Sequence, residues 1–84
     1  MEFNSINPYT NKVIGSYKGI SDDELNQKLV LAQNAQKKWQ KLSLKERCNL
    51  MLSAAQVLRD NLEEYAQMIS LEMGKPISES RGEI

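Results

Sequence analysis

The chain has 84 residues, of which 40% are apolar and 26% charged, a composition that predicts one small globular domain with little core material. Eleven basic and eleven acidic residues give a formal net charge of zero. Without a concentrated positive field, neither nucleic acid nor an anionic membrane is expected as a partner. One cysteine, no recognisable secretory signal and no long apolar stretch predict a cytoplasmic protein without an internal disulfide.

The first 19 residues predict a β-hairpin. Two β-prone segments, Phe3–Ile6 and Val13–Tyr17, flank a stretch rich in turn-forming residues. Pro8 fixes φ there, and Asn11 tolerates the left-handed region of backbone conformation. Because an isolated two-stranded hairpin is marginally stable in water, we expect other structure to lie against it.

Residues 20–84 predict a helical segment that begins with two serine caps. Ser21 and Ser43 are each followed three residues later by Glu, the capping-box pattern, in which the Ser hydroxyl accepts from the third helical N–H and the Glu side chain reaches back. Helices are therefore expected from about Asp22 to Lys41 and from about Leu44 to Arg59. The short link between them predicts that they pack as an αα-hairpin.

Each of these two helices is expected to bury one apolar stripe. The stripe of the first is predicted to contain Leu25, Leu29, Ala32 and Trp39, widened by Val30, and that of the second Leu50, Met51, Ala54, Val57 and Leu58.

Asn61 is a weaker cap for a third helix, expected from Leu62 to Met73. Gly74 suits a left-handed C-terminal position, and Pro76 suits the first turn of a fourth helix. The chain stops in the second turn of that helix. The expected fold class is thus an α+β fragment of an α/β enzyme, with an N-terminal β-hairpin, three helices and the start of a fourth, truncated at its C-terminal end.

No catalytic, cofactor-binding or metal-binding residue is assigned. Cys48 is the only thiol, and with no His in the chain to act as its base we interpret it as a small, partly buried apolar residue. One Cys and scattered carboxylates do not supply the ligands of a zinc site. The four glycines are isolated, so no phosphate-binding loop is predicted.

Taken in order, these elements resemble the N-terminal segment of the aldehyde dehydrogenase superfamily. The resemblance covers nearly the whole chain, and its order and spacing are specific although each motif is weak alone. It is carried by Asn7-Pro8, Thr10–Ile14, Trp39, Leu42, Glu46-Arg47, Leu50, Leu71–Pro76, Glu79 and Arg81–Glu83. The stretch Glu63–Ile69, together with Met73, is similar to the succinate-semialdehyde dehydrogenase branch. Asn11 stands where the family usually has Gly, and both residues accept the left-handed conformation.

The resemblance implies a parent enzyme that oxidises an aldehyde, such as succinate semialdehyde, to its acid with NAD or NADP. It implies a nucleophilic Cys in a downstream motif, which Cys48 does not match. Residues 1–84 would then be the N-terminal part of the cofactor-binding domain, a scaffold without cofactor and without activity of its own. Its expected partners are the missing remainder of the parent or a second copy of the chain.

A different class of function is a free-standing helical module that grips a partner helix through its exposed stripe. An unfinished last helix argues against this alternative, because a self-contained module would cap its ends.

Overall fold

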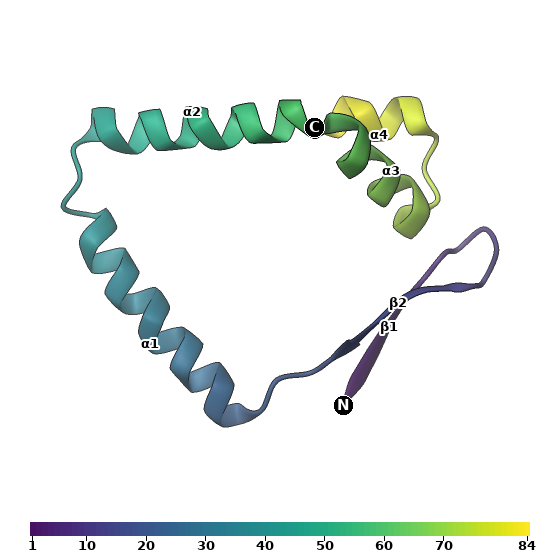
Figure 1. Cartoon of the computed structure of the whole chain (residues 1–84), viewed down its shortest axis with the longest axis horizontal. Coiled ribbons are helices and arrows are strands. Elements are labelled where there is room, and N and C mark those ends of the chain that lie inside the picture. Colours follow the sequence, from purple (N-terminus) through teal and green to yellow (C-terminus); the bar gives the residue numbers. More distant parts are fainter.

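The computed structural model describes all 84 residues as one hairpin followed by four helices (Figure 1). This order confirms the predicted fold class. The elements are β1 (Glu2–Ile6), β2 (Val13–Lys18), α1 (Asp22–Trp39), α2 (Leu44–Asp60), α3 (Leu62–Met73) and α4 (Ile77–Glu83).

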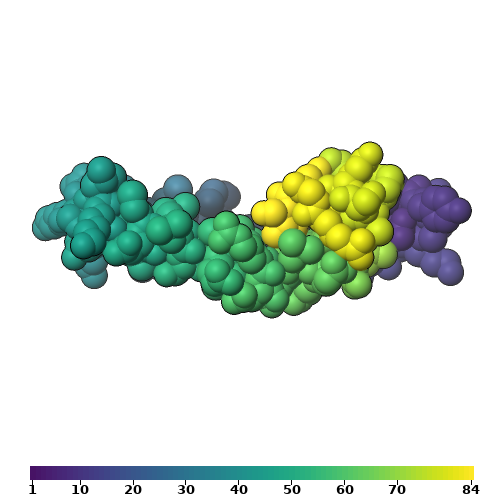
Figure 2. Space-filling model, turned by 90° about the horizontal axis from the view of Figure 1, so that it is seen from above, coloured from purple at the N-terminus to yellow at the C-terminus, as the bar shows by residue number.

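The chain is much more open than its length predicts. Its radius of gyration is 17.5 Å, whereas a compact domain of this length would have about 12 Å. The shortest of its three dimensions is 14 Å, close to the roughly 10–12 Å diameter of one helix with its side chains. Viewed edge-on, the molecule is a single layer that thickens where α3 and α4 lie (Figure 2). Most elements therefore have no second layer to pack on.

Strands β1 and β2 pair antiparallel, as predicted, with Phe3 opposite Tyr17. The turn is held by Asn7, whose side-chain oxygen accepts from the backbone N–H of Tyr9 at 2.9 Å. Asn11 has φ 59°, the left-handed conformation expected for it. A register shift between Ser5 and Ile6 interrupts the ladder next to this turn.

The two serine caps differ in the structure. At α2 the predicted capping box is complete, since Ser43 Oγ accepts from Glu46 N at 3.1 Å and Glu46 Oε2 accepts from Ser43 N at 2.8 Å. At α1 only the first bond forms, from Glu24 N to Ser21 Oγ at 3.2 Å. The expectation that Glu24 reaches back to Ser21 is therefore wrong.

Asn61 does not act as the predicted side-chain cap of α3. Its Nδ2 donates instead to the carbonyl of Val57 at 2.9 Å, which also accepts from the backbone N–H of Asn61 at 3.2 Å, so both groups of Asn61 close the end of α2. Pro76 directly precedes α4 rather than lying in its first turn.

Helix α1 ends at Trp39, two residues before the predicted end at Lys41. The chain leaves the helix in a tight turn, in which the backbone N–H of Lys41 donates a hydrogen bond to the carbonyl of Lys38.

The predicted αα-hairpin of α1 and α2 is wrong. The two helices diverge from their link at a wide angle (Figure 1). A short link brings two helix ends together but does not set the angle between the helices, which depends on facing apolar surfaces. Here those surfaces do not meet, so the expected buried stripe is exposed: Leu25 by 44% and Trp39 by 38%. Neither helix contains a fully buried residue.

The tightest tertiary packing is between α3 and α4. Ala66 and Ser80 are completely buried there, and the hydroxyls of Ser70 and Ser80 share a hydrogen bond of 2.8 Å. Small side chains allow the two helices to approach closely. The link between them begins at Gly74, which has φ 71° and closes α3 by donating to Ser70 O, as its sequence position predicted.

Two solvent-exposed ion pairs stabilise the contact between α3 and α4. Arg81 binds Glu63 in a bidentate manner, with Nε to Oε1 at 2.6 Å and Nη2 to Oε2 at 3.1 Å, and Lys75 pairs with Glu83. The hydrogen bond and charge of Arg81 lower the pKa of Glu63 below its ordinary value, although partial burial opposes this. The bond and charge of Glu83 likewise raise the pKa of Lys75.

The turn of the hairpin lies against this helix pair. Ser5 Oγ donates to Glu72 Oε1 at 2.9 Å, and a Cβ added at Gly74 would lie 3.1 Å from Pro8 Cγ. The hairpin, α3 and α4 therefore form one connected unit, while α1 and α2 extend away from it (Figure 1).

Because the capping box is complete at α2 but not at α1, alanine substitutions of Glu46 and Glu24 should have different effects. Glu46→Ala should lower the helix content because it removes a bond of the complete box, whereas Glu24→Ala removes none. Ser43→Ala should cost about 1 kcal/mol of helix stability. Far-ultraviolet circular dichroism of the variants checks this, and equal losses for Glu46→Ala and Glu24→Ala would contradict it.

Two glycines on either side of Pro76 should respond oppositely to alanine. Gly74→Ala places a Cβ on a left-handed residue and close to Pro8, so it should destabilise the chain by about 1–2 kcal/mol. Gly82 lies in α4 with nothing within 4 Å, and Gly82→Ala should stabilise that helix by up to about 1 kcal/mol. Urea titrations of both variants measure the change in the free energy of unfolding. A Gly74→Ala variant as stable as the natural chain would refute the prediction for Gly74.

The Glu63–Arg81 pair predicts acid sensitivity of the α3–α4 unit. Because the folded-state pKa of Glu63 is lowered, its contribution to stability is complete above the ordinary Glu pKa of about 4.3 and disappears as pH falls through the lower folded value. Glu63→Gln should remove the part of the pH dependence of stability that Glu63 causes and leave the contributions of the other carboxylates. Helix content followed from pH 7 to pH 2 tests it, and identical acid titrations of the two proteins would exclude this role.

Candidate functional site

The structure brings no catalytic constellation together. No group of three or more His, Cys, Asp or Glu side chains is placed to hold a metal ion. Cys48 is exposed on α2, so its interpretation as a partly buried residue is wrong. The reason is the same opening of α1 and α2 that exposes their stripes. None of the helices combines the length and apolar character that crossing a bilayer requires.

The glycines do not fit a dinucleotide. A phosphate-binding loop needs glycines close together in a turn that leads into a helix, so that backbone N–H groups can approach the phosphates. Gly15 and Gly19 are isolated on or beside β2 and face side chains of their own hairpin, Tyr17 and Phe3. Gly74 closes a helix and Gly82 lies inside one. The absence of a cofactor site from these residues stays a prediction.

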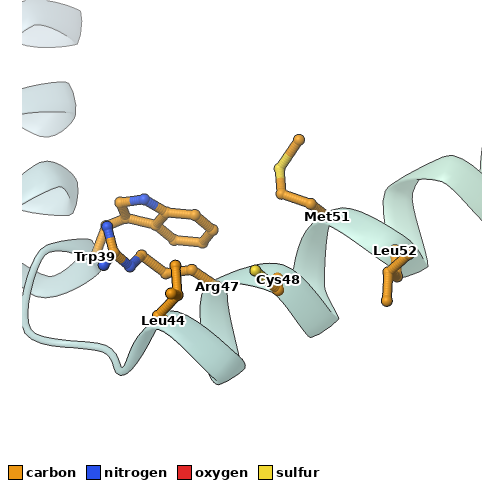
Figure 3. A pocket seen from close by; sticks show the side chains of 6 residues that line it. All are labelled: Trp39, Leu44, Arg47, Cys48, Met51 and Leu52. Atoms are coloured by element: carbon orange, nitrogen blue, oxygen red, sulfur yellow. The ribbon is translucent and has the colours of Figure 1, made fainter.

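The feature that could have a function is apolar surface on α1 and α2. At the junction of the two helices lies a shallow groove of about 480 Å³, which we call the junction groove (Figure 3). It is lined by Trp39, Leu44, Arg47, Cys48, Met51 and Leu52. A second hollow of about 480 Å³ lies along α1 and is lined by Asn26, Gln27, Val30 and Leu31.

These two hollows show that both helices are apolar on more than one side. At about 100° per residue, Val30 lies nearly opposite Leu25 on α1, so it does not widen the predicted stripe but begins another. On α2, Leu50 and Val57 likewise point away from Leu44. A surface helix has one apolar stripe, whereas a helix that is apolar around much of its circumference is typical of a protein interior.

Arg47 is the unusual member of the junction groove. It is half-buried, while Leu44, Met51 and Leu52 beside it are 70%, 62% and 66% exposed. Its Nε is buried without a hydrogen-bond partner. Arg47 was not predicted to belong to a site. The available signal was that Arg47 lies one helical turn after Leu44, in the first turn of a helix whose short link leads back to Trp39.

Comparison with known proteins identifies the family. The model of the "Aldehyde dehydrogenase family" matches residues 1–84, the whole chain. No solved structure matches.

Several relatives are semialdehyde dehydrogenases. The chain is 38% identical over 79 residues to malonate-semialdehyde dehydrogenase of Listeria monocytogenes serotype 4a (strain HCC23) and to that of Listeria innocua serovar 6a; each match covers 94% of this chain and 16% of the relative. It is 30% identical over 82 residues to the NADP(+) succinate-semialdehyde dehydrogenase of Deinococcus radiodurans, covering 98% of this chain and 17% of the relative.

The chain thus spans about a sixth of the length of the curated relatives it matches. The family match over every residue, together with the ordered motifs from Asn7 to Glu83, shows that this chain belongs to the aldehyde dehydrogenase family.

Proposed function

We propose that these 84 residues are an N-terminal scaffold segment of an NAD(P)-dependent aldehyde dehydrogenase and have no catalytic activity alone. In this role the segment supplies packing surface to the remainder of the enzyme. The nucleophile and the cofactor-binding residues belong to that remainder.

The observation that supports this proposal is uncovered surface. The chain exposes 7237 Å², whereas a compact monomer of 9.6 kDa would expose about 5,100 Å². The excess of about 2,100 Å² is more than twice the roughly 800 Å² that each partner contributes to a standard protein interface. Such an excess favours permanent burial within a larger fold over the transient contact of a free-standing helical module.

The parent enzyme, on this proposal, oxidises a semialdehyde to a dicarboxylic acid. The support is that relatives with 30–38% identity are named malonate-semialdehyde and succinate-semialdehyde dehydrogenases. The similarity of Glu63–Ile69 to the succinate-semialdehyde branch agrees with this substrate class. The reducing cytoplasm, which suits a chain with one unpaired thiol, is the proposed compartment.

Without the remainder of the enzyme, the same surface favours self-association. Net charge is zero, so repulsion between copies is weak, and burial of exposed Leu, Val and Met side chains would stabilise a closed assembly.

A chimeric enzyme tests the scaffold role. This chain should replace the matched segment of the Listeria monocytogenes malonate-semialdehyde dehydrogenase and keep the enzyme active within about tenfold of its natural kcat/KM. The free chain should produce no NAD(P)H from malonate or succinate semialdehyde. The matched control carries Leu25→Asp and Leu29→Asp, which place charges on the α1 stripe and should abolish soluble, active chimera.

Each of the following results would refute the proposal. The first is turnover by the free chain that persists after Cys48→Ser and repurification. The second is an inactive or insoluble chimera. The third is an active chimera that tolerates both Asp substitutions.

A further inference from the structure

We propose that the junction groove is a docking site for a segment of the parent enzyme beyond residue 84 that carries a carboxylate next to an apolar side chain, with Arg47 binding the carboxylate. The inference rests on the proposed function, because the occupant belongs to the remainder of that enzyme.

The position of Arg47 among its neighbours is unusual for a charged residue. The charged residue is more buried than Leu44, Met51 and Leu52, which line the same groove. Figure 3 shows the Arg47 side chain extending beside Trp39, at the end of the groove where α2 begins with Leu44, while Cys48, Met51 and Leu52 follow further along α2. A segment that covers the groove at Trp39 and Leu44 would also remove the guanidinium from water.

A covered guanidinium requires an acceptor. Arg is always protonated, and a buried unpaired cation is strongly destabilising. Inside this chain no acceptor serves Arg47: its Nε has no hydrogen-bond partner, and the ion pairs of the structure are Lys75–Glu83 and Arg81–Glu63. A purely apolar occupant is therefore excluded, and charge complementarity selects a carboxylate, the acceptor that the planar fork of Arg binds best.

Arg81 shows what the completed site would resemble. Its guanidinium is bound by both oxygens of Glu63, and that contact joins two helices. Arg47 has the same chemistry in a more apolar setting, and no carboxylate of this chain binds it. A carboxylate from the incoming segment would complete it, while Trp39, Met51 and Leu52 would receive the neighbouring apolar side chain.

The free chain allows a direct test, because Trp39 is its only tryptophan and lies in the groove. The probes are 4-phenylbutyrate and its uncharged amide, followed by Trp39 fluorescence. The carboxylate should bind about threefold more tightly than the amide, the size expected of a solvent-accessible ion pair. Arg47→Met should abolish this preference for the carboxylate. Arg59 is exposed on the same helix, and Arg59→Met should retain the preference.

A second measurement uses the chimera and carries the inference to the occupant itself. Arg47→Lys places an amine in the groove, and a carbodiimide then joins it as an amide to an adjacent carboxylate. Peptide mass spectrometry should find the partner Asp or Glu outside residues 1–84. Arg59→Lys is the matched control and should form little of this product.

The proposal is overturned if the free chain binds amide and carboxylate equally. It is also overturned if an active Arg47→Lys chimera forms no amide beyond residue 84, or forms one only with a second copy of this segment. An inactive parent chimera would instead refute the scaffold role, and the fluorescence result would then decide the groove by itself.

Discussion

The structure depends on an imbalance between the apolar surface that the chain carries and the apolar surface that it can cover. Only Ala66 and Ser80 are fully buried among 84 residues. Burial of apolar area is the dominant favourable term in folding, and here most of that term is unused. The exposed Leu, Val and Met side chains of α1 and α2 are therefore the main determinant of how this chain behaves, because they require a cover that the chain does not contain.

Apart from the contacts of the hairpin with α3 and α4, what persists without such a cover is local structure. Hydrogen bonds within the hairpin turn, the complete box at Ser43 and the left-handed Gly74 each join residues that are at most a few positions apart. These features were predictable because short segments of sequence determine them: Asn11 and Gly74 tolerate positive φ, and Ser21 and Ser43 offer an oxygen to free N–H groups. The element order and the strand and helix bounds followed from the same signals to within a few residues.

Tertiary packing was not predictable in the same way. Periodicity at Leu25, Leu29 and Trp39 correctly identified an apolar stripe, but periodicity states only that a surface requires burial, not which partner buries it. The predicted partner of α1 was α2, because their link is short, and the structure shows that the link does not impose that contact. Arg47 was missed for a related reason. Its burial depends on the position of Trp39 at the end of another helix, which a linear pattern does not specify.

The contrast between the two helix pairs explains why one packs and the other does not. Between α3 and α4, small residues meet at Ala66, Ser70 and Ser80, and Glu63 neutralises Arg81 at the edge, so no buried side-chain polar atom at this contact lacks a hydrogen-bond partner. Between α1 and α2, the side chains at the junction are large, and Arg47 has no acidic partner. Closing α1 onto α2 would bury that cation without compensation, at a free-energy cost that apolar contact would have to exceed. The open arrangement keeps part of the Arg47 side chain accessible, and it leaves the groove available to a segment that supplies the missing charge.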